Sequence, residues 1–269
     1  MFRLLLLDID GTLRPYDRPE IPAENVEAIR ALQRFGVKVA IATGRSRAGV
    51  PEAVMNGIRP DYWICSAGAQ ILDREDRELY GCRMPQETVE KICAFCRERD
   101  FPLILNYPEG CYIHLGYDSY CSRQDVPSDK KYAIHDPDDS RRRKDQPYSC
   151  FAWMPQAREE EFHREFPDSG VSFYFYRGKF CDVMQTSVTK ASGLDRLLEL
   201  TGIALSESVF IGDGENDISL LRQAGLSWCM GDGAPAAKAA ADRIGPASGS
   251  LGVAKICREL WPQAFDTII

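Results

Sequence analysis

Two acidic residues close to the start of the chain follow directly on a run of leucines. The run Leu4–Leu7 shows no alternation of polar and apolar residues, and it is followed by Asp8 and Asp10. Such a run predicts a strand that is covered on both faces, as in parallel sheets. The two carboxylates then lie at the carboxyl end of the strand, outside which open α/β sheets bind ligands. Because close carboxylates repel each other, the pattern predicts a divalent cation such as Mg²⁺, with a capping turn as the alternative.

Three further stretches place polar residues next to predicted strands or helices. A threonine, a glycine and an arginine stand between a strand and a helix, where a hydroxyl and free backbone N–H groups form an anion site. Taken singly, these residues fit a common turn, a lone lysine fits a surface position, and one or two acids fit helix caps. Together with Asp8 and Asp10, however, the acids of these stretches number four. Four acids that accompany a threonine, a lysine and an asparagine at strand ends are hard to explain by capping. The residues are Thr43, Gly44, Arg45, Lys190, Asp213, Asn216 and Asp217.

The order of the predicted elements in the first part of the chain indicates an α/β protein with a doubly wound parallel sheet. A helix over 24–36 and a strand over 37–44 complete a strand–helix–strand unit. Residues 46–58 are then expected to be helical, and residues 61–72 to form a third strand that runs into a glycine turn.

The middle third of the chain has a different order of predicted helices and strands, which indicates an inserted domain. Predicted helices over 86–99 and 156–166 alternate with strands, and two aromatic strands join at Arg177 and Gly178. This two-residue turn favours an antiparallel hairpin. Alternation of strands and helices then returns, so the first and last thirds are expected to form one Rossmann-like domain. The expected domains are the core, residues 1–81 and 183–269, and an inserted α+β domain, residues 82–182.

Two patterns inside the insertion are interpreted as structural. The basic tract at 141–144 follows an acidic stretch, which favours a solvated loop with balanced charge over a nuclear signal or an anion site. Cys93 and Cys96 fall on one apolar face of the predicted helix, so core packing is favoured over a redox or zinc site.

The composition limits the class of protein and its partners. At 269 residues with 44% hydrophobic content, the chain is long enough for one large or two moderate globular domains. Its net charge of −7 argues against nucleic acid or an anionic membrane as the main partner. No apolar run approaches the roughly 20 residues of a membrane span. With ten scattered cysteines and no export signal, we expect a cytoplasmic protein with reduced thiols.

Four short motifs, taken together and in this order, resemble those of the haloacid dehalogenase superfamily, in particular its Cof-type phosphatases with a type IIB cap. The motifs are DIDGT, TGR, Lys190 and GDGEND. The similarity covers nearly the whole chain, although the insertion matches only in length and in the order of its elements. Relatives often have Asn-Gly-Ala after the third strand, whereas this chain has Ala67 in place of the asparagine, which removes an amide that in relatives lies near the site.

The resemblance implies a phosphoaspartyl mechanism. Asp8 would be the nucleophile, and the side chain of Asp10 would protonate the leaving group and later take a proton from the attacking water. Mg²⁺ would be held by the Asp8 carboxylate, the main-chain carbonyl of Asp10, and Asp213. Asp217 would act from outside this ligand set, by fixing Lys190 or a metal-bound water.

The same resemblance implies how the transferring phosphoryl group is bound. The hydroxyl of Thr43, the neighbouring amides at Gly44 and Arg45, and the catalytic Lys190 would balance its negative charge. Asn216 would bind phosphate or orient its loop.

The function expected from the resemblance is a Mg²⁺-dependent phosphatase for small phosphorylated metabolites, with sugar phosphates as the favoured class. A phosphomutase of the same fold is the alternative, and a non-catalytic binding or regulatory relative is disfavoured by the intact acids. We expect a monomer or a weak homo-oligomer. The insertion would act as a lid that excludes water and recognises the leaving group of the substrate. Its candidate substrate contacts are Tyr107, His114, Tyr117, Arg177 and Asp182.

Overall fold

The chain forms two compact units in the computed structural model, which describes residues 1–124, 126, 133–176 and 178–266. The first unit comprises Met1–Gly44, Val50–Tyr80 and Thr189–Ile269. The second comprises Arg45–Gly49 and Gly81–Val188.

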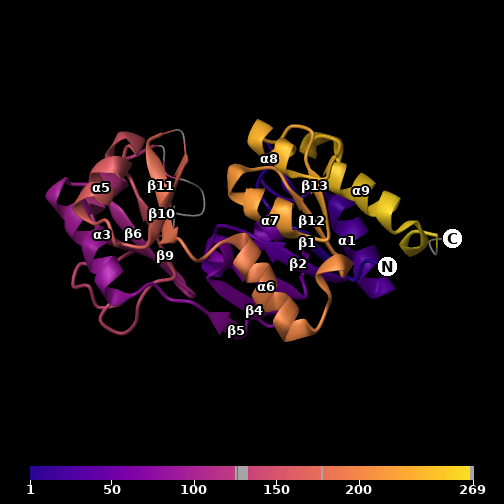
Figure 1. Cartoon of the computed structure of the whole chain (residues 1–269), viewed down its shortest axis with the longest axis horizontal. Coiled ribbons are helices and arrows are strands. Elements are labelled where there is room, and N and C mark those ends of the chain that lie inside the picture. Colours follow the sequence, from indigo (N-terminus) through magenta and orange to yellow (C-terminus); the bar gives the residue numbers. More distant parts are fainter. Residues whose placement is uncertain (125, 127–132, 177, 267–269) are drawn as a thin grey trace. The chain divides into compact units, whose positions relative to one another are not determined.

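The first unit is built on an eight-stranded sheet with the strand order β14-β13-β12-β1-β2-β3-β4-β5 (Figure 1). The strands from β14 to β3 run parallel, and β4 pairs antiparallel with β3. The chain moves outward from β1 through β2 and β3, and it later returns to place β12 on the other side of β1. This order confirms the predicted doubly wound sheet. Its strands are β1 (Leu4–Leu7), β2 (Lys38–Ala42), β3 (Tyr62–Cys65), β4 (Gln70–Asp73), β5 (Glu78–Gly81), β12 (Ser208–Gly212), β13 (Leu226–Cys229) and β14 (Arg243–Ile244).

Helices cover both faces of this sheet, which explains the unbroken leucine run. Leu5 and Leu7 pack in one core cluster with α1 (Ala23–Phe35) and α9 (Gly252–Leu260). The alternate residues Leu4 and Leu6 pack in a second cluster with three other helices. All four leucines are fully buried, so neither face of β1 requires a polar residue. The helices of the second cluster are α6 (Lys190–Thr201), α7 (Ile218–Gln223) and α8 (Pro235–Ala240).

The helix expected over residues 46–58 is wrong. Arg47–Gly49 forms a single 3-10 turn, and α2 spans only Glu52–Met55. Pro51 stands directly before α2. Proline has no N–H to donate and restricts the residue that precedes it, so a helix cannot run through this position without a break.

The second unit contains a six-stranded sheet with the order β10-β11-β9-β6-β7-β8. β10 and β11 pair antiparallel, which confirms the predicted hairpin, and among the described residues of this sheet the parallel pair is that of β7 and β8. The alternating residues of β6 divide the core: Leu103 and Leu105 pack in a cluster with α3 and α5, and Ile104 packs in a second cluster with Tyr120 of α4. The elements are α3 (Gln86–Glu98), β6 (Leu103–Tyr107), β7 (Gly110–Leu115), α4 (Tyr117–Cys121), β8 (Ile134–His135), β9 (Ser149–Ala152), α5 (Glu159–Glu165), β10 (Val171–Tyr176) and β11 (Phe180–Gln185).

The basic tract at 141–144 is only partly the solvated loop that the sequence predicts. The guanidinium carbon of Arg141 lies 3.8 Å from the ring centre of Tyr107, and its side chain is 14% exposed. The carboxylate of Asp136 accepts from the amides of Ser140 and Arg141, each at 2.9 Å. Asp136 therefore fixes a turn that contains the start of the basic tract. The side chain of Arg141 packs on the ring of Tyr107 and does not extend into solvent.

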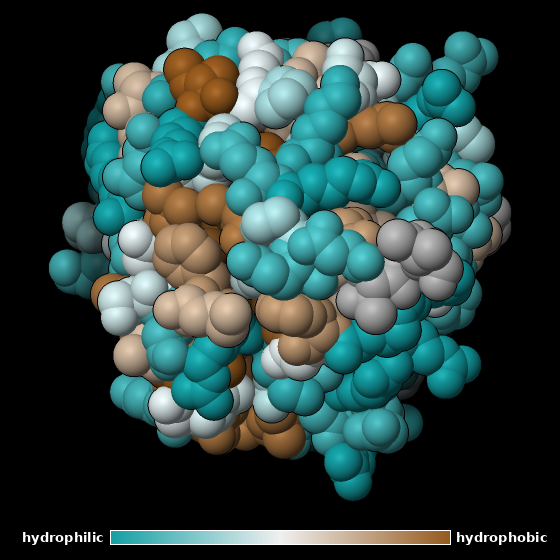
Figure 2. All heavy atoms as spheres, turned by 90° about the vertical axis from the view of Figure 1, so that its right-hand side faces the viewer, coloured by the Kyte–Doolittle hydropathy of each residue, from teal (hydrophilic) through white to brown (hydrophobic). Residues whose placement is uncertain are grey.

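Figure 2 shows one face of the molecule, on which hydrophilic residues predominate and hydrophobic ones lie in separate groups. Cys93 and Cys96 are buried in the cluster around α3 and carry free thiols. Within the described parts of the chain, every helix is too short or too polar to span a lipid bilayer.

Candidate active site

The register of two neighbouring strands brings two of the predicted acids together. β1 pairs with β12 so that Leu7 lies opposite Ile211, and the amide of Asp8 donates to the carbonyl of Ile211 at 3.1 Å. Asp8 follows β1 directly and Asp213 follows β12, and each residue is only 6% exposed. The strand order reverses between these two strands, and a doubly wound sheet binds its ligand at such a switch point.

Lys190 lies fully buried between two of the acids. It is the first residue of α6, whose start is fixed by a capping box between Thr189 and Ser192. Its Nζ donates to Oδ1 of Asp8 and to Oδ1 of Asp217, each at 2.6 Å. The lysine side chain has no exposed surface. The surface position that a lone lysine normally takes is therefore excluded here.

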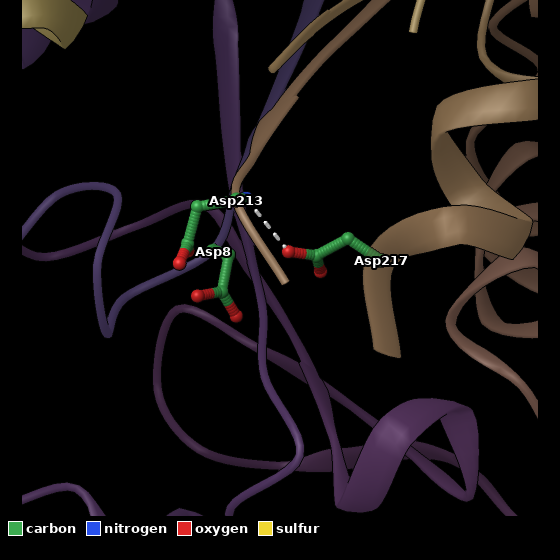
Figure 3. Close-up of side chains that lie close together, drawn as sticks. All are labelled: Asp8, Asp213 and Asp217. Atoms are coloured by element: carbon green, nitrogen blue, oxygen red, sulfur yellow. Dashed lines mark hydrogen bonds between the residues drawn. The ribbon is translucent and has the colours of Figure 1, made fainter. Parts of the chain in front are cut away.

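Asp217 uses its second oxygen to hold the loop after β12. Oδ2 accepts from the amides of Asp213 and Gly214, each at 2.9 Å, and Figure 3 shows the first of these bonds. Both oxygens of Asp217 are thus engaged by the lysine and the loop. In Figure 3 the carboxylates of Asp8 and Asp213 lie side by side, and Asp217 approaches from the start of α7.

The buried charges of this cluster are unbalanced. Burial raises the pKa of Asp8 well above its ordinary value although Lys190 opposes the change. Burial and the neighbouring Asp217 raise the pKa of Asp213 to about 7. Burial by itself lowers the pKa of Lys190, but Asp217 and Asp8 outweigh it, so this lysine stays charged. Three carboxylates therefore face one ammonium group.

This excess of negative charge fits a divalent cation. One carboxylate oxygen from each of Asp8, Asp213 and Asp217 lies within 4.8 Å of the others. Carboxylate and carbonyl oxygens are the ligands that Mg²⁺ prefers, and a cation of charge two would offset the excess. Because both oxygens of Asp217 already accept hydrogen bonds, Asp8 and Asp213 are the carboxylates of this group that suit Mg²⁺.

Residues of the loop after Asp8 orient the Asp213 carboxylate. The buried hydroxyl of Thr12 donates to Oδ1 of Asp213 at 2.8 Å, and the hydroxyl of Tyr16 donates to Oδ2 at 3.3 Å. Gly11 has a φ of +86°, and a Cβ at this position would lie 2.2 Å from Oδ2 of Asp213. Only glycine allows the backbone to pass so close to this oxygen.

The second predicted acid of the first motif is paired with a residue that sequence reasoning missed. Nε of Arg14 donates to Oδ1 of Asp10 at 3.1 Å. Thr12 and Tyr16 were also missed as partners of Asp213. The sequence gives no sign of the contacts from Arg14 and Tyr16, because residues 10–14 form a turn and the pairing of charges four residues apart is a property of helices.

The predicted phosphate-binding residues follow the neighbouring strand. Thr43 comes directly after β2, is buried, and donates its amide to the carbonyl of Ile64 at 2.9 Å. Its carbonyl accepts from the amide of Ala67 at 3.0 Å. Ala67 itself has a φ of +48°, where asparagine and glycine are the usual residues. Thr43 is thus tied to the turn after β3 that contains Ala67.

The other predicted phosphate-binding residues are more exposed. Gly44 and Asn216 are half-buried, and Asn216 lies in the 3-10 turn Glu215–Asp217. The guanidinium of Arg45 donates to the carbonyl of Gly49 at 3.0 Å within the second unit. The phosphate-binding roles of these three residues stay predictions.

The candidate contacts in the insertion occupy different environments. Tyr107 is fully buried, and His114 lies with its Nδ1 3.0 Å from Oδ1 of Asp139. Tyr117 is 38% exposed and stacks on the His135 ring at 3.7 Å. Asp182 is half-buried in β11, and Arg177 lies outside the described residues. Tyr107 is therefore a core residue of its unit.

Comparison with known proteins supplies the family. A family model described as haloacid dehalogenase-like hydrolase matches residues 5–256. A chloroplastic endoribonuclease YBEY of Arabidopsis thaliana is 25% identical over 270 residues, which cover 94% of this chain but only 45% of that protein. The HMP-PP phosphatase of Yersinia pseudotuberculosis is 25% identical over 248 residues, covering 88% of this chain and 87% of that one. The solved structure of the HAD subclass IIB sugar phosphatase BT4131 has a TM-score of 0.81 at 26% identity, covering 96% and 98% of the two chains.

The fold and the acids at its switch point define an α/β enzyme with a doubly wound core. The chain belongs to the haloacid dehalogenase-like hydrolase family, because the family model spans nearly all of it. Its relatives of similar length include a phosphatase and a subclass IIB sugar phosphatase.

Proposed function

We propose that the chain is a Mg²⁺-dependent phosphatase that hydrolyses small phosphorylated metabolites through an aspartyl phosphate on Asp8. The observation that carries this proposal is the position of Asp8 at the switch point, 2.6 Å from the buried ammonium group of Lys190. A carboxylate oxygen held beside a fixed cation is suited to attack a phosphoryl group whose charge that cation balances.

In the first step, an oxygen of Asp8 attacks phosphorus as the bond from phosphorus to the leaving oxygen breaks. Asp10 gives its proton to that oxygen, so an alcohol leaves and Asp8 carries the phosphoryl group. In the second step, water attacks phosphorus, gives a proton to Asp10, and breaks the bond to Asp8. Inorganic phosphate leaves, and both acids return to their starting forms.

The residues suited to hold Mg²⁺ are Asp8, Asp213 and the main-chain carbonyl of Asp10. When bound, the ion supplies positive charge that stabilises the transferring phosphoryl group and offsets repulsion between the carboxylates. Asp217 acts from outside this set, since its oxygens hold Lys190 and the loop after β12. Thr43, with the amides at Gly44 and Arg45, and Asn216 would bind the phosphoryl oxygens.

We further propose that residues 82–182 form the cap domain and that the substrates are sugar phosphates. The similarity to BT4131, a sugar phosphatase, over nearly the whole of both chains supports this substrate class. The plant endoribonuclease is more than twice as long as the region that matches this chain, so its name gives no support for a ribonuclease activity here. The cytoplasmic location and the monomeric or weakly oligomeric state stay predictions from the sequence.

A single-turnover assay with a panel of phosphorylated metabolites at equal concentration tests this proposal. With Mg²⁺ present, a substrate should release one inorganic phosphate for each active site. Return of the phosphoryl group to another position of the sugar, without phosphate release, would indicate a phosphomutase. The absence of phosphoryl transfer from every compound would contradict the proposal.

A further inference from the structure

The loop that follows Asp10 returns to place an arginine beside it. The amide of Gly11 donates to the carbonyl of Arg14 at 2.8 Å, and the amide of Arg14 donates to the carbonyl of Ile9 at 2.8 Å. These two bonds form an isolated bridge between Asp10 and Arg14. The backbone therefore fixes the point from which the arginine side chain extends.

The guanidinium group of Arg14 is held at both ends. Its Nε donates to Oδ1 of Asp10 at 3.1 Å, and its Nη2 donates to the same oxygen. Its Nη1 donates to the carbonyl of Arg18 at 2.8 Å. The Arg14 side chain is 13% exposed. A planar guanidinium tied through three N–H groups has little freedom left, so it fixes a carboxylate more firmly than a flexible lysine would.

We infer that Arg14 is a positioning residue for the proton transfers of Asp10, and this inference rests on the proposed function. Because Oδ1 of Asp10 accepts two N–H groups, a proton that Asp10 carries belongs on Oδ2. Proton transfer needs that oxygen within hydrogen-bond reach of its partner, and a carboxyl group free to rotate spends time out of reach. Arg14 directs Oδ2 toward the leaving-group oxygen in the first step and toward the attacking water in the second.

Two substitutions of Arg14 and one matched control test this role. Arg14→Met removes the three N–H donors and keeps an apolar chain. Arg14→Lys keeps the positive charge but lacks the planar guanidinium group with its fixed N–H donors. Arg18→Met makes the same kind of change in the same loop, to a side chain that is exposed. Only the main-chain carbonyl of Arg18 accepts from Arg14, so this control preserves that bond.

The readout is the rate of enzyme phosphorylation in one turnover, measured by rapid quench with nitrophenyl phosphate and with a sugar phosphate that the wild type hydrolyses. Nitrophenolate leaves without a proton, whereas a sugar alkoxide needs one. We expect Arg14→Met to slow the sugar phosphate roughly 10- to 100-fold and nitrophenyl phosphate less than about 3-fold. Arg14→Lys should fall between Arg14→Met and the wild type, and Arg18→Met should match the wild type.

A double variant shows whether Arg14 acts through Asp10. In an Asp10→Asn background, Arg14→Met should cause no further loss, because the group that it positions no longer transfers a proton. An equal loss with both substrates, or a further loss in the double variant, would overturn the inference and leave the proposed function standing. A lack of any leaving-group difference in Asp10→Asn alone would contradict the proposed function itself. If Arg14→Met does not fold, Arg14→Lys provides the same comparison.

Discussion

Replacing Lys190 with methionine should destabilise the protein strongly in metal-free buffer. The substitution keeps most of the apolar chain and removes the ammonium group that donates to Asp8 and Asp217 at 2.6 Å each. The side chain of Lys190 is fully buried and that of Asp217 equally so, which means that water cannot replace the lost contacts. Two buried carboxylates would then remain without their cation.

The expected loss follows from the burial of this ion pair. Removal of one partner from a buried pair costs about 3–5 kcal/mol, because the remaining charge is left uncompensated. An exposed pair contributes about 0–1 kcal/mol. Lys38, which donates to Asp61 at 3.0 Å with its own side chain 51% exposed, offers the matched control. Lys38→Met should therefore cost less than about 1 kcal/mol.

Urea unfolding at pH 8 with EDTA, followed by circular dichroism, measures both variants. Each free energy of unfolding is extrapolated to zero urea, and the slopes with urea concentration should be equal, so that only stability differs. Saturating Mg²⁺ should restore part of the loss in Lys190→Met, since the ion binds the folded state only. Equal losses for Lys190→Met and Lys38→Met would refute the view that the buried lysine neutralises the acid cluster.

Two further predictions concern the metal and the pH. Phosphate release should stop in EDTA and return with Mg²⁺. Calcium should inhibit, because its larger coordination shell draws both oxygens of Asp8 into contact with the ion. Phosphate release with calcium as the sole divalent cation would contradict this prediction. In EDTA, the free energy of unfolding of the wild type relative to Asp213→Asn should fall as the pH rises from about 4 to about 7. Burial raises the pKa of Asp213 from 3.8 to about 7, so the folded state keeps a proton that the unfolded state releases in this window. Urea titrations at several pH values measure this difference, and a rise across the window would show the sign to be wrong.

Patterns of hydrophobic residues were sufficient to predict the core of the fold. The leucine run Leu4–Leu7 indicated a strand covered on both faces, and the two clusters that divide its residues confirm this. The antiparallel pairing of β10 and β11 confirms the predicted hairpin, whereas the predicted turn includes Arg177, which lies outside the described residues. The helix expected over 46–58 does not form because Pro51 interrupts it, so that only the short α2 follows the proline.

The candidate site was predictable where residue type and strand position coincide. Asp8 and Asp213 stand directly after apolar strands, so their proximity followed once the strands were taken to be neighbours. The burial of Lys190 could not be predicted from the sequence pattern, because a lysine before a helix is normally exposed. Arg14 and Tyr16 contact the acids through the path of a short loop, and no periodic pattern records such a path.

The central claim is that Asp8 carries the phosphoryl group and Asp10 transfers the protons. Mass spectrometry of Asp10→Asn after mixing with nitrophenyl phosphate tests it most directly. Nitrophenolate should leave in a burst without a proton, and hydrolysis should then stall because the base is missing. The protein should gain roughly 80 Da, the mass of one phosphoryl group, located on Asp8. Asp8→Asn should show neither the burst nor the added mass, and a burst of equal size from Asp8→Asn would contradict the account.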